Sequence, residues 1–258
     1  MTEVPEYPAA HNLLGGKVVA ITAAAGTGIG SAVARRCLEE GASVVISDAH
    51  ERRLHETAAE LAELGKVHPI ACDVTDEAQV SALIDGTVEQ FGRLDVMINN
   101  AGLGGTASVL EMTDQQWNKV IDVTLNGTFR CTRAALNQFA TQGGGGAVVN
   151  NASVVGWRAQ AGQAHYAAAK AGVMALTRCS AIDAAGNGSR VNAVAPSLAA
   201  HPFLAKVTSD ELLGDLAKQE AFGRSAEPWE IANVMVFLAS DYASYLTGET
   251  ISASSQHP

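Results

Sequence analysis

Short runs of β-branched and apolar residues alternate along the chain with longer segments whose apolar positions recur every three or four residues. The short runs predict buried strands, and the longer segments predict helices with one apolar face. The predicted strands are 17–22, 43–47, 67–72, 95–99, 147–152, 190–195 and 249–253; the predicted helices are 28–40, 51–64, 76–91, 113–140, 163–185 and 228–240. Such alternation favours a doubly wound α/β fold, in which helices cover both faces of a parallel sheet.

Two segments interrupt the regular alternation. Residues 197–225 separate a strand from the next helix, contain short helical patterns at 203–207 and 210–220, and are long enough to predict a lid over a substrate site. Residues 1–14 contain prolines and glutamates but no apolar stretch, so we expect a tail outside the fold, ordered by a partner subunit if at all. We therefore expect a single domain over residues 15–258.

Composition narrows the class of protein. A hydrophobic content of 47% fits a globular enzyme, and a net charge of −10 disfavours nucleic-acid binding. The four cysteines are scattered without a C-x-x-C pair, which favours free thiols in a reducing cytoplasm and disfavours a metal site. No apolar run reaches the length of a membrane span, and the first residues do not resemble a signal peptide.

The first predicted strand leads into a glycine-rich turn that opens a helix. Its sequence is Thr22-Ala-Ala-Ala-Gly26-Thr-Gly28-Ile-Gly30. Backbone N–H groups in such a turn can approach a pyrophosphate, whose charge the helix N-terminus favours. We therefore expect Gly26, Thr27, Gly28, Ile29 and Gly30 to bind a dinucleotide, although the glycine spacing is unusual.

Asp48 ends the second predicted strand, 18 residues after Gly30. An acidic residue at this place accepts a hydrogen bond from the ribose 2′-hydroxyl of NAD and repels the 2′-phosphate of NADP. The glycine-rich turn contains no arginine, so NAD is the expected cofactor and NADP is less favoured. The alternative role for Asp48 is to cap the following helix.

Two further turns follow the third and fourth predicted strands. They contain Asp73-Val74 and Asn100-Ala101-Gly102. Ligands of parallel sheets bind outside the carboxyl ends of the strands, so both turns are expected to border the dinucleotide. Ordinary strand-ending turns remain the alternative.

Tyr166 and Lys170 lie one helical turn apart, and Ser153 precedes the tyrosine by thirteen residues. An ammonium group beside a phenol would lower the phenol pKa toward neutrality. Such a phenol can act as a general acid or base, which points to proton chemistry on an alcohol or a ketone. Alone, the pair also fits an ordinary amphipathic helix.

Together, these motifs and the stretch 190–196 resemble the short-chain dehydrogenase/reductase family, over most of residues 16–253. The resemblance implies a seven-stranded Rossmann-like sheet, hydride transfer to or from a nicotinamide, and assembly into a homodimer or homotetramer. It makes Tyr166 the acid/base, Ser153 a donor to the substrate oxygen, and Lys170 a ligand of the nicotinamide ribose that lowers the tyrosine pKa. By the same resemblance, Pro196 and Ser197 contact the cofactor.

The chain departs from the family pattern at several positions. Ala23 or Ala24 stands where the turn has its first glycine, and Thr124 stands at the position of a catalytic asparagine. Asn126 lies about 200° around the helix from that position and does not replace it. We expect the Thr124 hydroxyl to hold a water that relays protons to Lys170. His201 replaces a threonine that contacts nicotinamide, and it faces either the cofactor, the substrate or solvent.

Other stretches, among them 150–160 and the C-terminal Gln-His-Pro, resemble family members that act on bicyclic remnants of sterol rings, as acids or CoA thioesters. We therefore expect Trp157 and Phe203 to line an apolar substrate pocket and Arg158 to meet a carboxylate or a CoA phosphate. Core packing for Trp157 and a solvated loop position for Arg158 are the alternatives.

Three functions fit these observations. The first is an NAD-dependent dehydrogenase or ketoreductase for a bulky alicyclic substrate. The second is a 3-ketoacyl-type reductase, which would favour NADPH and an arginine near the turn. The third is a catalytically silent NAD-sensing or scaffold protein, against which Ser153, Tyr166 and Lys170 argue.

Overall fold

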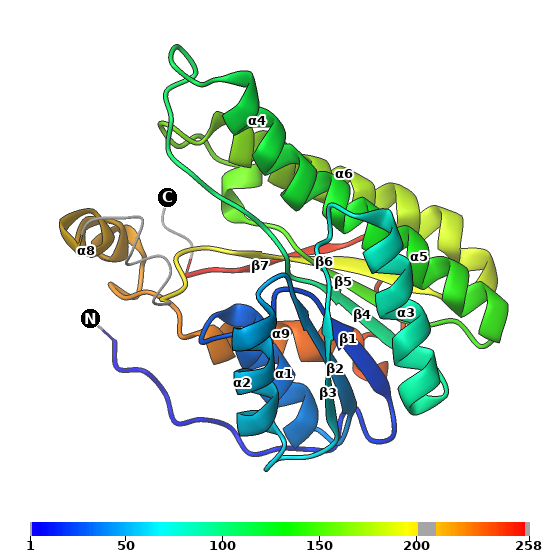
Figure 1. Ribbon diagram of the computed structural model, residues 1–258. Helices are drawn as coiled ribbons and strands as arrows, with labels where there is room; N and C mark the ends of the chain where they lie inside the picture. The colour runs from blue at the N-terminus through cyan, green and yellow to red at the C-terminus, as the bar shows by residue number, and fades with distance from the viewer. Residues whose placement is uncertain (1, 201–209, 256–258) are drawn as a thin grey trace.

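The structure, a computed structural model, describes residues 2–200 and 210–255. Its strands form one sheet in the order β3-β2-β1-β4-β5-β6-β7, and every neighbouring pair is parallel (Figure 1). The strands are β1 Val18–Ile21, β2 Ser43–Asp48, β3 Val67–Ala71, β4 Val96–Asn99, β5 Ala147–Asn151, β6 Arg190–Pro196 and β7 Thr250–Ala253. The predicted doubly wound single domain is confirmed.

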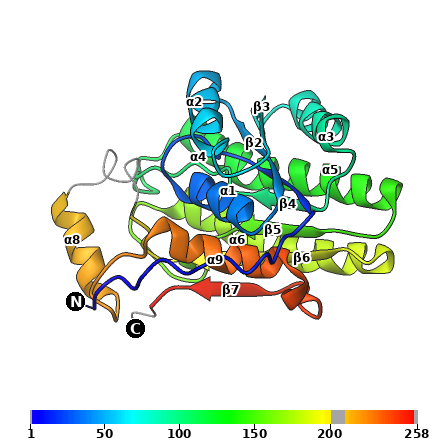
Figure 2. The same cartoon turned by 90° about the horizontal axis from the view of Figure 1, so that it is seen from below.

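Helices cover both faces of the sheet (Figure 2). One face packs against α1 (Ile29–Glu39), α2 (Glu51–Leu61) and α9 (Pro228–Ala239), and the other against α3 (Glu77–Phe91), α5 (Gly127–Gln142) and α6 (Ala164–Ala184). Every residue of β1 and β4 is buried, as expected for strands covered on both sides. The carboxyl ends of the strands are therefore held in fixed relative positions.

The long helix predicted from residue 113 consists of three parts. Thr113 and Gln116 form the predicted capping box at the start of α4 (Asp114–Ile121). A single π-helical turn, η1 (Asp122–Asn126), then joins α4 to α5. A π turn inserts one extra residue into the helix and often marks a functional site.

The expected tail at the N-terminus instead packs on the domain, which corrects that prediction (Figure 2). Leu14 is completely buried in the core beside α1. The buried Arg36 donates to the carbonyls of Pro8 and Ala9, and the Glu40 carboxylate accepts from the backbone N–H groups of His11 and Leu13. Two side chains at the C-terminal end of α1, Arg36 and the C-cap residue Glu40, thus pair with each other and also satisfy backbone polar groups of the segment.

The remaining described elements are α8 (Asp210–Gln219) and the short 3-10 helices η2 (Val154–Gly156), η3 (Ala185–Asn187) and η4 (Asp241–Ala243). The described parts of the expected lid are tied to the domain by an isolated bridge between Ala199 and Ala226, by the Ser197 N–H, which donates to the Ala253 carbonyl, and by the ion pair of Arg224 with Glu230. His201 and Phe203 lie outside the described residues. Among the described helices, none is both long and apolar enough to cross a membrane.

Candidate active site

The glycine-rich turn leaves β1 in an unusual backbone conformation. Ala23 has φ +50°, a left-handed value that usually requires glycine, while Ala24 is buried and donates its N–H to the Ser47 carbonyl. Ala23 is therefore the residue that takes the place of the missing glycine. Gly30 is required beside it, because a Cβ there would lie 2.3 Å from the Ala23 carbonyl oxygen.

The start of α1 is open toward the carboxyl edge of the sheet. Gly28 is the N-cap, and no side chain caps the helix there. A Cβ on Gly26 or Gly28 would meet nothing within 4 Å, so space exists for a ligand to reach the backbone. Uncapped N–H groups at a helix N-terminus suit a pyrophosphate, which a dinucleotide carries. The Gly26 N–H is already used, since it donates to the Thr57 hydroxyl at 2.9 Å.

Asp48 is the last residue of β2, and its carboxylate reaches across to the turn. One oxygen accepts from the His50 N–H at 2.8 Å, and the other accepts a long bond from the Ala25 N–H at 3.4 Å. No side chain caps the first turn of α2, where Asp48 bonds only the N–H of the N-cap residue, His50. The carboxylate thus sits beside the glycine-rich turn, where an adenine ribose would pass.

The turns after β3 and β4 also reach this edge. Asp73 accepts hydrogen bonds from the backbone and hydroxyl of Thr75, so its carboxylate is held in its own turn. Thr22 joins the other turn to β1, because its hydroxyl accepts from the N–H groups of Asn100 and Ala101 at 3.0 Å each. Val74 is buried and packs against α5.

Ser153 lies two residues after the end of β5, and Tyr166 lies in the first turn of α6. Both are brought together, and their side chains share a hydrogen bond that lowers the tyrosine pKa. Burial nevertheless dominates and raises the pKa of Tyr166 above its ordinary value. The expected lowering by Lys170 is therefore wrong for this geometry. At neutral pH the phenol is protonated, which is the state that donates a proton.

Lys170 is 98% buried, with 2% of its surface exposed. Its Nζ donates to the Asn151 carbonyl at 2.5 Å and lies 5.5 Å from the Tyr166 ring centroid. Burial lowers the pKa of Lys170 to about 8. Gly102 lies beside this ammonium group, since a Cβ on that residue would lie 3.4 Å from Nζ.

Thr124 lies in the π turn η1 and is fully buried. Its hydroxyl accepts from the Leu103 N–H at 3.0 Å and donates to the Leu103 carbonyl at 3.1 Å. The hydroxyl proton is thus committed to the backbone after β4, and Thr124 holds that turn against the helix. Asn126 is exposed and bonds Asp122, so it plays no part in this contact.

Four candidate residues lie at the rim of the carboxyl edge of the sheet, namely Trp157, Arg158, Pro196 and Ser197. Trp157 follows η2 and is 53% exposed, which excludes the core-packing alternative. Arg158 is next to it and half-buried. Pro196 ends β6, and the Ser197 N–H donates to the Ala253 carbonyl after it. These residues therefore border the same edge as Ser153.

A family model described as Enoyl-(Acyl carrier protein) reductase matches residues 23–255. A curated short-chain reductase of Streptomyces niveus is 38% identical over 247 residues, covering 93% of this chain and 94% of its own. The chain belongs to the short-chain dehydrogenase/reductase family. It is therefore an oxidoreductase that uses a nicotinamide cofactor and acts on a small molecule.

Within this family, one relative is much more similar. The (5R,7aS)-5-hydroxy-7a-methyl-1-oxo-2,3,5,6,7,7a-hexahydro-1H-indene-carboxyl-CoA reductase of Mycobacterium tuberculosis is 65% identical over 260 residues, covering 100% of this chain and 99% of its own. A 3-oxoacyl-[acyl-carrier-protein] reductase of Thermotoga maritima is 39% identical, covering 92% of this chain and 96% of its own. A crystal structure of a short chain dehydrogenase from Mycobacterium smegmatis superposes with a TM-score of 0.89 at 57% identity, covering 99% of both chains.

Sequence reasoning missed one contributor to the site. Asn151, the last residue of β5, offers its carbonyl to Lys170 and its side-chain amide to Asn100. The signal that could have identified Asn151 was its position as a polar residue at the end of a buried strand. This signal could not separate it from its neighbour Asn150, which has the same side chain but bonds Thr177 in the core.

Proposed function

We propose that the protein is an NADH-dependent reductase that acts on a ketone of a bicyclic, sterol-derived acid, carried as its CoA thioester. The observation that carries the reaction type is the meeting of Ser153, Tyr166 and Lys170 at one edge of the sheet, beside an open helix N-terminus. The relative at 65% identity, named for a methyl-oxo-indene-carboxyl-CoA substrate, supports the substrate class.

The chemical step needs a hydride and a proton, and the bound nicotinamide would supply the hydride. Tyr166, protonated at neutral pH, would donate the proton to the carbonyl oxygen as negative charge develops there. Ser153 would hold the same oxygen through its hydroxyl. Lys170, in its charged form, would stabilise the phenolate that Tyr166 becomes, because opposite charges attract strongly in a buried site.

The residues at the nucleotide end would hold NADH in this order along the edge. The first N–H groups of α1, at Gly28, Ile29 and Gly30, would bind the pyrophosphate, with Thr27 beside them. Asp48 would accept from the adenine ribose and repel a 2′-phosphate, which favours NADH over NADPH. The nicotinamide half would pass the turn carrying Ala101 and reach Pro196 and Ser197, while Asp73 and Val74 would border the adenine.

Residues at the rim of the carboxyl edge would contact the substrate. The half-exposed Trp157 indole offers a flat apolar surface for fused rings, and Arg158 offers a guanidinium group for a CoA phosphate. A 3-ketoacyl-type reductase is the second candidate, favoured by the relative at 39% identity.

The enzyme would act in the cytoplasm, which is consistent with its four free cysteines. It would act there as a homo-oligomer.

The test is a two-by-two assay that follows the absorbance of the reduced nicotinamide. Purified protein receives NADH or NADPH with a methyl-oxo-indene-carboxyl-CoA or with a 3-oxoacyl-CoA of similar mass. We expect the fastest turnover with NADH and the bicyclic thioester, and we expect Asp48→Ser to admit NADPH. Faster turnover of the 3-oxoacyl-CoA with NADPH would overturn both choices. Tight NADH binding without any turnover would instead identify a silent protein.

A further inference from the structure

One line of side-chain contacts connects the catalytic lysine to the glycine-rich turn. Lys170 Nζ donates to the Asn151 carbonyl, and the Asn151 amide nitrogen donates to Asn100 Oδ1 at 2.9 Å. The Asn100 amide nitrogen donates in turn to the carbonyls of Ala23 at 3.0 Å and Thr22 at 3.2 Å. Four segments that are far apart in the sequence thus meet in one chain of hydrogen bonds.

The direction of these bonds is fixed by the backbone. The carbonyls of Thr22 and Ala23 can only accept, so Asn100 must present its nitrogen to them and its oxygen to Asn151. Asn151 must then present its nitrogen to Asn100. Its own amide oxygen is left buried and, among the described residues, without a partner. An aliphatic side chain would avoid that unpaired acceptor, so the amide's contribution is its bond to Asn100.

Both ends of this line of hydrogen bonds lie at positions where a small displacement would disturb the site. At one end, Ala23 holds a left-handed backbone conformation, and its carbonyl packs within reach of Gly30 at the start of α1. Such a conformation persists only where surrounding contacts hold it. At the other end, the Asn151 carbonyl is the hydrogen-bond partner of the buried Lys170 ammonium group. A shift of Asn151 would therefore move both the pyrophosphate turn and the acceptor of the lysine.

We propose that Asn151 is a positioning residue that couples the dinucleotide turn to Lys170. The Asn151 side chain does not contact the glycine-rich turn directly. It acts on Ala23 through Asn100, and the Asn151 backbone carbonyl acts on Lys170. The inference rests on the proposed function, since it requires a dinucleotide at the turn.

The test uses Asn151→Ala, Asn100→Ala and the double variant, with NADH binding measured by calorimetric titration. Because both single variants break the same line of contacts, we expect each to weaken NADH binding about fivefold to tenfold, and the double variant to be little weaker than the worse single variant. The second readout is the pH profile of kcat/KM, which reports groups of the free enzyme. Loss of a well-placed carbonyl disfavours the ammonium form, so the alkaline fall of Asn151→Ala should begin at lower pH.

Thr177→Val is the matched control. It removes a buried hydrogen bond from the neighbouring asparagine of the same strand, Asn150, without changing the size of the side chain. It should lower stability yet leave NADH affinity and the pH profile unchanged. The inference is overturned if Asn151→Ala binds NADH as tightly as the unaltered enzyme, if the two single effects multiply, or if Thr177→Val shifts the pH profile equally. Failure of the unaltered protein to bind NADH would refute the proposed function instead.

Discussion

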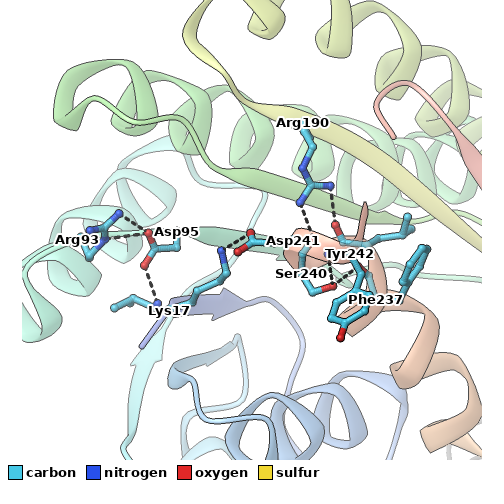
Figure 3. A network of polar contacts seen from close by, with 10 residues as sticks. Lys17, Arg93, Asp95, Arg190, Phe237, Ser240, Asp241 and Tyr242 are labelled. Atoms are coloured by element: carbon cyan, nitrogen blue, oxygen red, sulfur yellow. Dashed lines mark hydrogen bonds and ion pairs between the residues drawn. The ribbon is translucent and has the colours of Figure 1, made fainter. Parts of the chain in front are cut away.

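The two edges of the sheet hold their charged side chains in different ways. At the amino edge, Lys17 pairs with Asp241 at 2.8 Å and Arg93 pairs with Asp95 at 2.6 Å (Figure 3). The guanidinium group of Arg190 donates to the carbonyls of Leu238 and Ser240, at the C-terminus of α9. Each cation therefore meets a carboxylate or the negative end of a helix, which is the arrangement that stabilises a fold.

At the carboxyl edge, the cation Lys170 has a different environment. Lys170 is buried against a neutral carbonyl, and none of the ion pairs between described residues includes it. Ala23 holds a left-handed conformation there, and Asn151 keeps an unpaired buried oxygen. Each of these features costs stability. A left-handed residue and an unpaired buried oxygen also occur at the amino edge, at Asn12 and Ser189, so the buried cation without a carboxylate partner is what distinguishes the carboxyl edge. This feature indicates that the carboxyl edge is arranged for binding and chemistry, at the expense of stability.

The largest predicted effect on activity comes from removing a single hydroxyl group at the carboxyl edge. We predict that Tyr166→Phe lowers kcat about 1,000-fold, because a positioned general acid contributes about 100-fold to 10,000-fold. Steady-state assays at saturating NADH measure the change. The matched control is Tyr242→Phe, which alters a 77% exposed tyrosine of η4 at the amino edge. An equal loss in both variants would contradict the assignment.

Lys170→Met should abolish most turnover and yet stabilise the fold. Burial lowers the lysine pKa from 10.5 to about 8, so the charged form is penalised below pH 8. Allowing for the lost bond to Asn151, we expect a gain of about 1–3 kcal/mol in unfolding free energy at pH 7, measured by urea denaturation. Between pH 8 and 10.5 the unfolded chain binds more protons than the folded one, so the unaltered protein gains stability and the difference narrows. A destabilised variant at pH 7 would contradict this account.

Arg190→Met should do the opposite at the amino edge. The substitution leaves the carbonyls of Leu238 and Ser240 without their charged donor, and we expect a loss of about 2 kcal/mol in unfolding free energy with kcat unchanged. Urea denaturation and the standard assay measure the two effects. Lys17→Met, which breaks an exposed pair, should cost less than about 1 kcal/mol. An activity loss larger than the stability loss explains would remove the distinction between the edges.

The smallest expected effect concerns Ala23. A left-handed alanine costs about 1–2 kcal/mol, while glycine gives the unfolded chain about 0.4–1 kcal/mol of extra conformational entropy. Ala23→Gly should therefore raise the unfolding free energy by about 0–1.6 kcal/mol, measured by thermal denaturation. A clear destabilisation would show that the Ala23 methyl group makes contacts that outweigh the strain.

Local patterns predicted most of the fold. Each strand and helix expected within the described residues lies within a few residues of its observed place, because the alternation of strands and helices leaves little freedom. The sequence could not decide between Ala23 and Ala24, since that choice depends on the contact with Ser47. It also missed the packed N-terminus, because Arg36 and Glu40 have the spacing of a solvated helix pair and only the tertiary structure shows their burial.

The site was predicted as a set of residues but not as an electrostatic environment. The sequence spacing predicted that Ser153, Tyr166 and Lys170 would lie close together, and they do, because the strand order follows from the fold. It failed on the tyrosine pKa, because burial depends on residues distant in the sequence, and here its effect on the pKa outweighs that of the hydrogen bond with Ser153. For the same reason, the bond from Thr124 to Leu103 could not be foreseen.

The most direct test is amide hydrogen exchange of the unaltered protein with and without saturating NADH. The account predicts increased protection at the carboxyl edge, in residues 22–30, 100–103 and 151–157, and unchanged exchange at the amino edge, in residues 14–18, 93–96 and 188–191. Protection confined to the amino edge, or none at either edge despite saturation, would contradict the claim that the carboxyl edge is the dinucleotide site.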